Sequence, residues 1–95
     1  MKQYEKALQR LAATVYESHD MLPGVPIIEL AGDRRVLIEN HHGVIEYADQ
    51  RICVKVKYGI LCVCGCDMEL AKMTKDQLVI TGQIGSVTIQ RRGNP

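Results

Sequence analysis

The sequence contains no phenylalanine and no tryptophan, and its four aromatic residues are all tyrosines. Any hydrophobic core must therefore be built from aliphatic side chains, methionine and cysteine. Positive and negative charges nearly cancel, for a net charge of +1, so the composition argues against nucleic acid as a partner. No apolar run approaches the roughly 20 residues that span a bilayer, and no signal-peptide pattern opens the chain. We therefore expect no transmembrane segment and a cytoplasmic location.

The chain is 95 residues long, which suits a single domain with short additions at its ends. Residues 2–18 predict an amphipathic helix, because apolar side chains recur at spacings of four, three and four at Tyr4, Leu8, Leu11 and Val15. We assign residues 1–20 to this N-terminal helix, 26–91 to a repeated β domain and 92–95 to a frayed tail. The helix is expected to pack on the domain or on a partner protein rather than on a membrane.

A repeated pattern follows the helix. The motif apolar-x-apolar-x-turn residue begins at residues 28, 45, 61 and 78, so its spacing is 17, 16 and 17 residues. Each copy is followed by a second alternating apolar pair, which gives about eight short strands with Gly or Asp at their corners. The pattern predicts a mainly β fold, either an antiparallel meander or a small sandwich. A short β-solenoid is the alternative, because a fixed period is also its signature.

Four cysteines gather on one face of the segment 51–66. If Tyr58-Gly59 is a two-residue hairpin loop, with Gly59 free to take a positive φ, Cys53 lies beside Cys64 on the face opposite the core. A zinc site is one interpretation of the set Cys53, Cys62, Cys64 and Cys66. The C-x-C-x-C spacing argues against it, because alternate sulfurs on a strand lie about 7 Å apart.

Two other interpretations of the cysteine face remain. Lys55 and Lys57 on the same face could activate a reactive thiol. Alternatively, the cysteines are small apolar fillers beneath a covering element, which is the interpretation we favour. A cytoplasmic protein keeps its thiols reduced, so the sequence does not predict a disulfide framework.

The segment IENHHG, residues 38–43, holds two adjacent histidines. Neighbouring side chains on an extended backbone point to opposite faces, so this pair suits a tight turn better than a joint ligand set. A catalytic pair of His41 with Glu39 or Glu46 is the enzymatic alternative. The sequence has no recognised nucleophile motif, phosphate-binding loop or HExxH motif, so we expect no enzyme and no cofactor.

The same segment resembles the YabP/YqfC sporulation protein family. The resemblance rests on PIIELAG (26–32), on VLIENHHGV (36–44), and on two glycine-punctuated strands at residues 59–70 and 78–87. It covers about residues 22–90, and IENHHG is its most specific part. It identifies Glu39, Asn40, His41 and Gly43 as family-motif residues whose binding role is undefined, whereas the cysteines fall on variable positions.

The resemblance implies a protein of spore-forming bacteria that acts in the mother cell and carries no catalytic residues. The YqfC branch is associated with a membrane protein, YqfD. We therefore expect a non-enzymatic sporulation protein that docks a protein partner such as a YqfD-like membrane protein, and that is peripheral to the membrane through it. Exposed strand edges offer self-association as a further expectation. The alternative function is a metal- or redox-responsive module that uses the cysteine face.

Overall fold

The computed structural model describes residues 23–92, and the helix predicted over residues 2–18 lies outside them. The described residues form one six-stranded sheet in the order β1-β2-β6-β5-β4-β3, and all neighbouring strands are antiparallel. The strands are β1 (Ile27–Ala31), β2 (Arg35–Glu39), β3 (Val44–Tyr47), β4 (Arg51–Val56), β5 (Gly59–Met73) and β6 (Gln77–Arg91). The predicted mainly β class is confirmed, and antiparallel hairpins replace the solenoid alternative.

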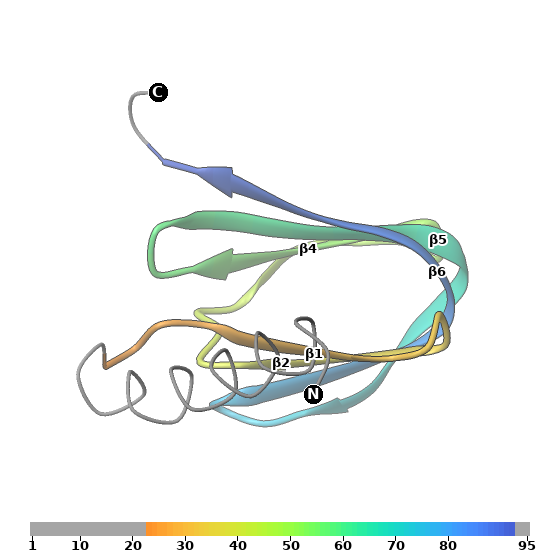
Figure 1. Cartoon of the computed structure of the whole chain (residues 1–95), viewed down its shortest axis with the longest axis horizontal. Coiled ribbons are helices and arrows are strands. Elements are labelled where there is room, and N and C mark those ends of the chain that lie inside the picture. Colours follow the sequence, from red (N-terminus) through yellow and green to blue (C-terminus); the bar gives the residue numbers. More distant parts are fainter. Residues whose placement is uncertain (1–22, 93–95) are drawn as a thin grey trace, which may run out of the picture.

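The sheet bends over itself into two layers (Figure 1). β5 and β6 are 15 residues each, and they stay paired with each other through the bend. The first layer holds β1, β2, the start of β6 and the end of β5. The second layer holds β3, β4, the start of β5 and the end of β6. Register shifts after Cys64 and after Cys66 break the regular ladder where the strands turn.

The predicted count of about eight strands is wrong, because four of the predicted segments run together as β5 and β6. Glycines permit this continuity. A Cβ on Gly65 would collide with the carbonyl oxygen of Gln83. Gly82 has φ +141°, and a Cβ on it would lie 2.6 Å from the carbonyl oxygen of Asp67, which is too close. These glycines let two strands bend in close contact, whereas the sequence pattern assigned them to turns between separate strands.

Ten buried apolar side chains fill the space between the layers. They come from both layers, which is why the bend is needed to bury them: Val36, Ile38, Ile52, Val54, Val56, Leu61, Val63, Met68, Leu78 and Ile80. The alternation of β4 and of the start of β5 puts every second residue into this core, as predicted. The side chains between them form the outer face of the second layer, which we call the outer face below.

The hairpin between β4 and β5 differs from the predicted one by one loop position. Val56 pairs with Gly59, so the two-residue loop is Lys57-Tyr58 rather than Tyr58-Gly59. As a result, Cys53 lies opposite Cys62 and not opposite Cys64. The physical reason lies in β6, because a Cβ on Gly59 would collide with the carbonyl oxygen of Gln90. Gly59 allows the close approach of two strands instead of forming the turn.

Candidate functional site

The segment Asn40–Gly43, which we call the crossover, carries the chain from β2 in the first layer to β3 in the second. Asn40 has a left-handed backbone with φ +64°. Its side-chain Nδ2 donates a hydrogen bond to the carbonyl oxygen of Val25 at 2.9 Å, and its backbone N–H donates to that of Asp76 at 2.7 Å. Asn40 therefore joins the start of β1 and the β5–β6 turn to the end of β2.

His41 is the one charged or polar side chain buried within the described residues, with 7% of its surface exposed. Its Nε2 lies 2.8 Å from the carbonyl oxygen of Thr74, and its Nδ1 lies 3.1 Å from the backbone nitrogen of Gly43. A carbonyl only accepts and a backbone N–H only donates, so Nε2 carries the proton and Nδ1 accepts. Both ring nitrogens thus hold the crossover against the β5–β6 turn.

The other motif residues also contact the main chain of neighbouring strands. His42 is exposed, and its backbone N–H donates to the carbonyl oxygen of Lys55 at 2.7 Å. Gly43 has φ +118°, and its carbonyl oxygen accepts from the N–H of Lys55 at 2.8 Å. Glu39 ends β2, where it pairs with β1 on one side and β6 on the other. The motif residues therefore brace the domain, in the sense that their hydrogen bonds hold neighbouring strands and turns together.

The structure does not form the catalytic pair of His41 with Glu39 or Glu46 that was the enzymatic alternative. Both ring nitrogens of His41 are engaged by main-chain groups of the crossover and the β5–β6 turn. Glu46 lies instead on the outer face, where its Oε1 is 3.3 Å from Nε of Arg51. An acid–base role for His41 would therefore require it to give up the contacts that hold it.

On the outer face, Cys53 and Cys62 are joined by a disulfide, with their Cα atoms 4.2 Å apart. Cys64 and Cys66 carry free thiols. The expectation of four reduced thiols is therefore wrong for the first pair, because the hairpin register places these two residues directly opposite each other. Within residues 23–92, no group of three or more His, Cys, Asp or Glu side chains lies together as a metal site requires. The four cysteines are not assembled as the zinc alternative needs.

Arg51 covers part of this cysteine pair. Its Nη2 lies 3.5 Å from Sγ of Cys62, and its Nη1 lies 3.7 Å from Sγ of Cys64. The hydrogen bond to Glu46 and its negative charge raise the pKa of Arg51 above its ordinary value. Cys53 and Cys62 are nearly buried although they lie on the outer face.

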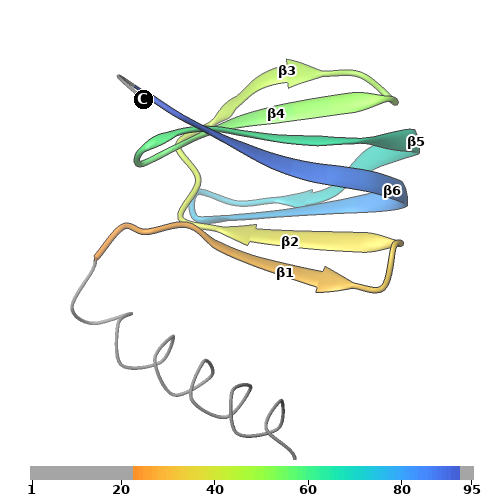
Figure 2. The same cartoon turned by 45° about the horizontal axis from the view of Figure 1, so that its top comes forward.

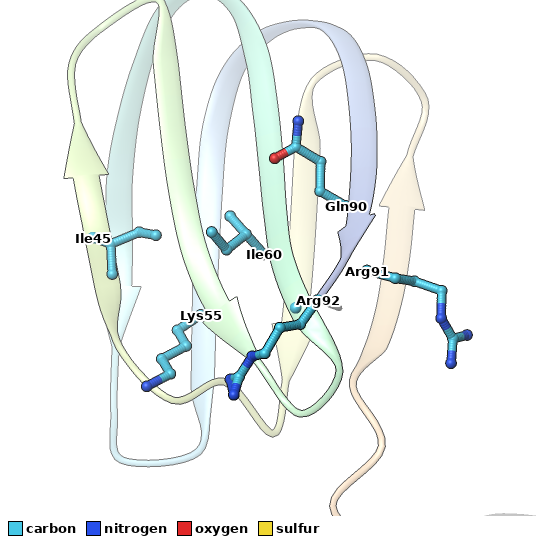
Figure 3. Close-up of a pocket in the computed structure, with 7 residues that line it drawn as sticks. Ile45, Lys55, Ile60, Gln90, Arg91 and Arg92 are labelled. Carbon is cyan, nitrogen blue, oxygen red and sulfur yellow. The ribbon is translucent and has the colours of Figure 1, made fainter. Parts of the chain in front are cut away.

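A shallow hollow of about 230 Å³ lies beside the cysteine pair on the outer face (Figure 3). Residues from β3, β4, β5 and β6 line it: Ile45, Lys55, Gly59, Ile60, Gln90, Arg91 and Arg92. Figure 3 shows Ile45 and Ile60 turned toward each other, Lys55 and Arg92 at one end, and Arg91 directed away. The hollow therefore combines an apolar floor with a cationic end.

Sequence reasoning did not find this hollow. Lys55 was placed correctly on the face opposite the core, but Ile60 and Gln90 become neighbours only through the pairing of β5 with β6. Ile45 joins them because a register shift in β3 falls between Val44 and Glu46. Neither feature has a local sequence signal.

The described residues thus define a small β domain made of one bent sheet, with a braced crossover and an open, partly cationic outer face. The chain belongs to the YabP family, whose model matches residues 25–95. Membership of this family indicates a sporulation-related protein. No curated protein and no solved structure matches the chain. Residues 23–92 contain no helix that is long and apolar enough to cross a membrane.

Proposed function

We propose that this protein is a non-enzymatic sporulation protein that acts in the mother cell by binding a protein partner through the hollow on its outer face. The partner that the family resemblance favours is a YqfD-like membrane protein. Binding it would hold the domain at the membrane surface.

The composition of the hollow carries this proposal. Two of its lining residues, Lys55 and Arg92, bring cationic side chains to one end of the hollow and no lining residue is acidic, so it complements a negatively charged segment. Ile45 is 54% exposed, which is a large apolar surface to leave in water beside these cations. A peptide that carries a carboxylate next to an aliphatic side chain satisfies both features.

The family motif residues contact the domain itself, which is consistent with a binding site elsewhere, in the hollow. Asn40, His41 and Gly43 direct their polar groups to main-chain partners within the domain. Their contacts fix the crossover, and the crossover leads directly into β3, which supplies Ile45 to the hollow. In this proposal the motif shapes the binding face without contacting the partner.

The test is co-purification of a YqfD-like protein with the tagged full chain from membranes of sporulating cells. Lys55→Glu combined with Arg92→Glu reverses the charge at the end of the hollow, and we expect capture to fall by at least about tenfold. Lys72→Glu combined with Lys75→Glu makes the same change in net charge at exposed positions of the first layer, and capture should persist. A folded Lys55/Arg92 variant that captures as well as the wild type would refute the proposal.

The disulfide supports a second candidate function, a redox response on the outer face. Reduction of Cys53–Cys62 by a dithiol would consume two electrons and two protons and leave two thiols beside Arg51. Partner capture should then differ between oxidised and reduced protein, and Cys53→Ser with Cys62→Ser should fix it at the reduced level. Cys66→Ser is the control, because this exposed thiol lies outside the pair. Equal capture in both states would exclude this function.

A further inference from the structure

The two layers leave four strand edges without a neighbouring strand among residues 23–92, and three of them are protected. β1 is five residues long with Glu29 at its centre, and β3 is four residues long and interrupted by a register shift. The end of β5 is broken by register shifts, and the N–H of Leu70 is 3.5 Å from the hydroxyl of Tyr47. Short, bulged or charged edges resist the addition of another strand.

The fourth edge, Gly85–Arg91 of β6, is longer, has no register shift beyond Gly85, and carries a charge only at its last residue, Arg91. β2 pairs only with residues 77–81 of β6, and the β1–β2 turn adds hydrogen bonds to Gly82 and Ile84. Beyond that point β6 runs along the margin of the second layer, with β5 on one side only (Figure 2). Its pairing with β5 is regular from Ser86 to Arg91, and no charged residue occurs between Gly82 and Gln90.

The direction of the backbone groups on this edge follows from the ladder. The 4.2 Å Cα separation of Cys53 and Cys62 is that of a pair without mutual hydrogen bonds, so the main-chain groups of Cys62 turn toward β6. Its partner Thr88 therefore bonds to β5, as does Arg92, whose N–H donates to Tyr58 at 2.6 Å. By alternation, the N–H and C=O groups of Val87 and Ile89 point away from β5, toward the open edge.

The side chains along the edge are complementary to a second copy of themselves. Val87 and Ile89 lie on the inner face, opposite core residues of β5, yet Ile89 is 58% exposed. If two copies pair antiparallel about Thr88, Val87 lies against the partner's Ile89 on the inner face and Thr88 lies against the partner's Thr88 on the outer face. Both kinds of cross-strand pair are favourable. Arg91 lies opposite the partner's Gly85, so the cations at the strand end are kept apart.

We propose that the Gly85–Arg91 edge is a self-association site, through which two copies of this chain form a two-fold symmetric dimer centred on Thr88. The four-stranded second layers then join into one continuous eight-stranded layer. The two hollows lie on the same outer face of this layer, so the dimer presents two equivalent cationic hollows. Gln90 and Arg91 belong both to this edge and to the lining of the hollow, but Thr88 does not line the hollow, so a substitution at Thr88 tests the dimer separately from the proposed function.

Analytical ultracentrifugation of the full chain tests the proposal. The wild type should sediment as a concentration-dependent dimer. Thr88→Lys places two ammonium groups opposite each other at the two-fold axis and should raise the dissociation constant by at least about tenfold. Ser86→Lys is the matched control, because residue 86 faces the partner's Gln90 and dimerisation should persist. An equimolar mixture of Thr88→Lys and Thr88→Glu should recover a mixed dimer.

Hydrogen exchange locates the interface. In the dimer the amides of Ile89 and Thr88 should both exchange slowly, whereas in a monomer with an open edge only that of Thr88 should. A wild type that stays monomeric, or a dimer that Thr88→Lys leaves unchanged, would overturn the proposal. A monomer with a protected Ile89 amide would also overturn it, by showing that another part of the same chain covers the edge.

Discussion

The crossover and the β6 edge differ in whether their polar groups have hydrogen-bond partners within the domain. In the crossover, Asn40 and His41 use side chains as well as backbone to form hydrogen bonds with the segment before β1, with the β5–β6 turn and within the crossover. On the edge Gly85–Arg91, every second residue leaves its backbone groups without a strand partner within residues 23–92. The crossover holds the fold together, whereas the edge and the neighbouring hollow are open to contact.

This difference shows why the most specific part of the family resemblance need not be a binding site. A buried histidine with both ring nitrogens engaged stabilises one geometry and offers little to a partner. The surface that is free to bind consists of common residues such as Ile45, Lys55 and Ile89, which no motif singles out. Three substitutions with matched controls test this contrast by stability, and each is best measured by urea unfolding at low protein concentration.

The largest loss of stability is expected at a core residue of β5 that lies beside the β6 edge. Leu61 and Ile89 are directly opposite each other in the β5–β6 ladder, but Leu61 is fully buried and Ile89 is 58% exposed. Leu61→Ala should lower the free energy of unfolding by about 2–5 kcal/mol, because it leaves a cavity in the core. Ile89→Ala should cost less than about 1 kcal/mol in the monomer. Equal costs would mean that the edge is already buried within one chain.

The next effect separates the two adjacent histidines. His41→Ala removes the partners of the Thr74 carbonyl and the Gly43 N–H, and it should cost about 2–4 kcal/mol. His42→Ala keeps its backbone hydrogen bond and changes only an exposed side chain, so it should stay within about 0.5 kcal/mol of the wild type. If the two variants were equally stable, the bracing role of the motif would be wrong.

The third and smallest effect on stability separates the side-chain hydrogen bond of Asn40 from its left-handed backbone conformation. Asn40→Ala loses the hydrogen bond to Val25 and places alanine at φ +64°, which together should cost about 1–2 kcal/mol. Asn40→Gly loses the same hydrogen bond but adopts the left-handed backbone freely, and it should cost less than about 1 kcal/mol. A glycine variant that is less stable than the alanine variant would show that the backbone conformation is not the constraint.

The alternation of apolar residues was enough to predict the β class and the core side chains of β4 and of the start of β5. It was not enough to predict where a strand ends. Gly65 has the same local signal as a turn glycine, but its missing Cβ makes room for Gln83 of another strand. The distinction depends on the long-range pairing of β5 with β6, which the sequence around Gly65 does not encode.

The candidate site shows the same limit. The pattern around His41 predicted a tight turn, whereas the structure has a bend at Asn40 followed by an irregular segment that buries one histidine and exposes the other. The disulfide was missed because a loop assigned one residue too late shifts each cross-strand partner by two positions, from Cys62 to Cys64. The hollow was missed because its walls come from four strands. The sequence predicted local features of the chain, whereas it did not predict which residues become neighbours across the sheet.

The central claim is that partner binding resides in the hollow and not in the exposed part of the family motif. The most direct measurement compares capture of a YqfD-like membrane protein by two folded full-length variants, His42→Ala and Lys55→Glu with Arg92→Glu. His42 is the exposed histidine of the motif, so its side chain is the one available to a partner. We predict that His42→Ala captures as the wild type does and that the hollow variant does not. Loss of capture in His42→Ala with retention in the hollow variant would contradict the account.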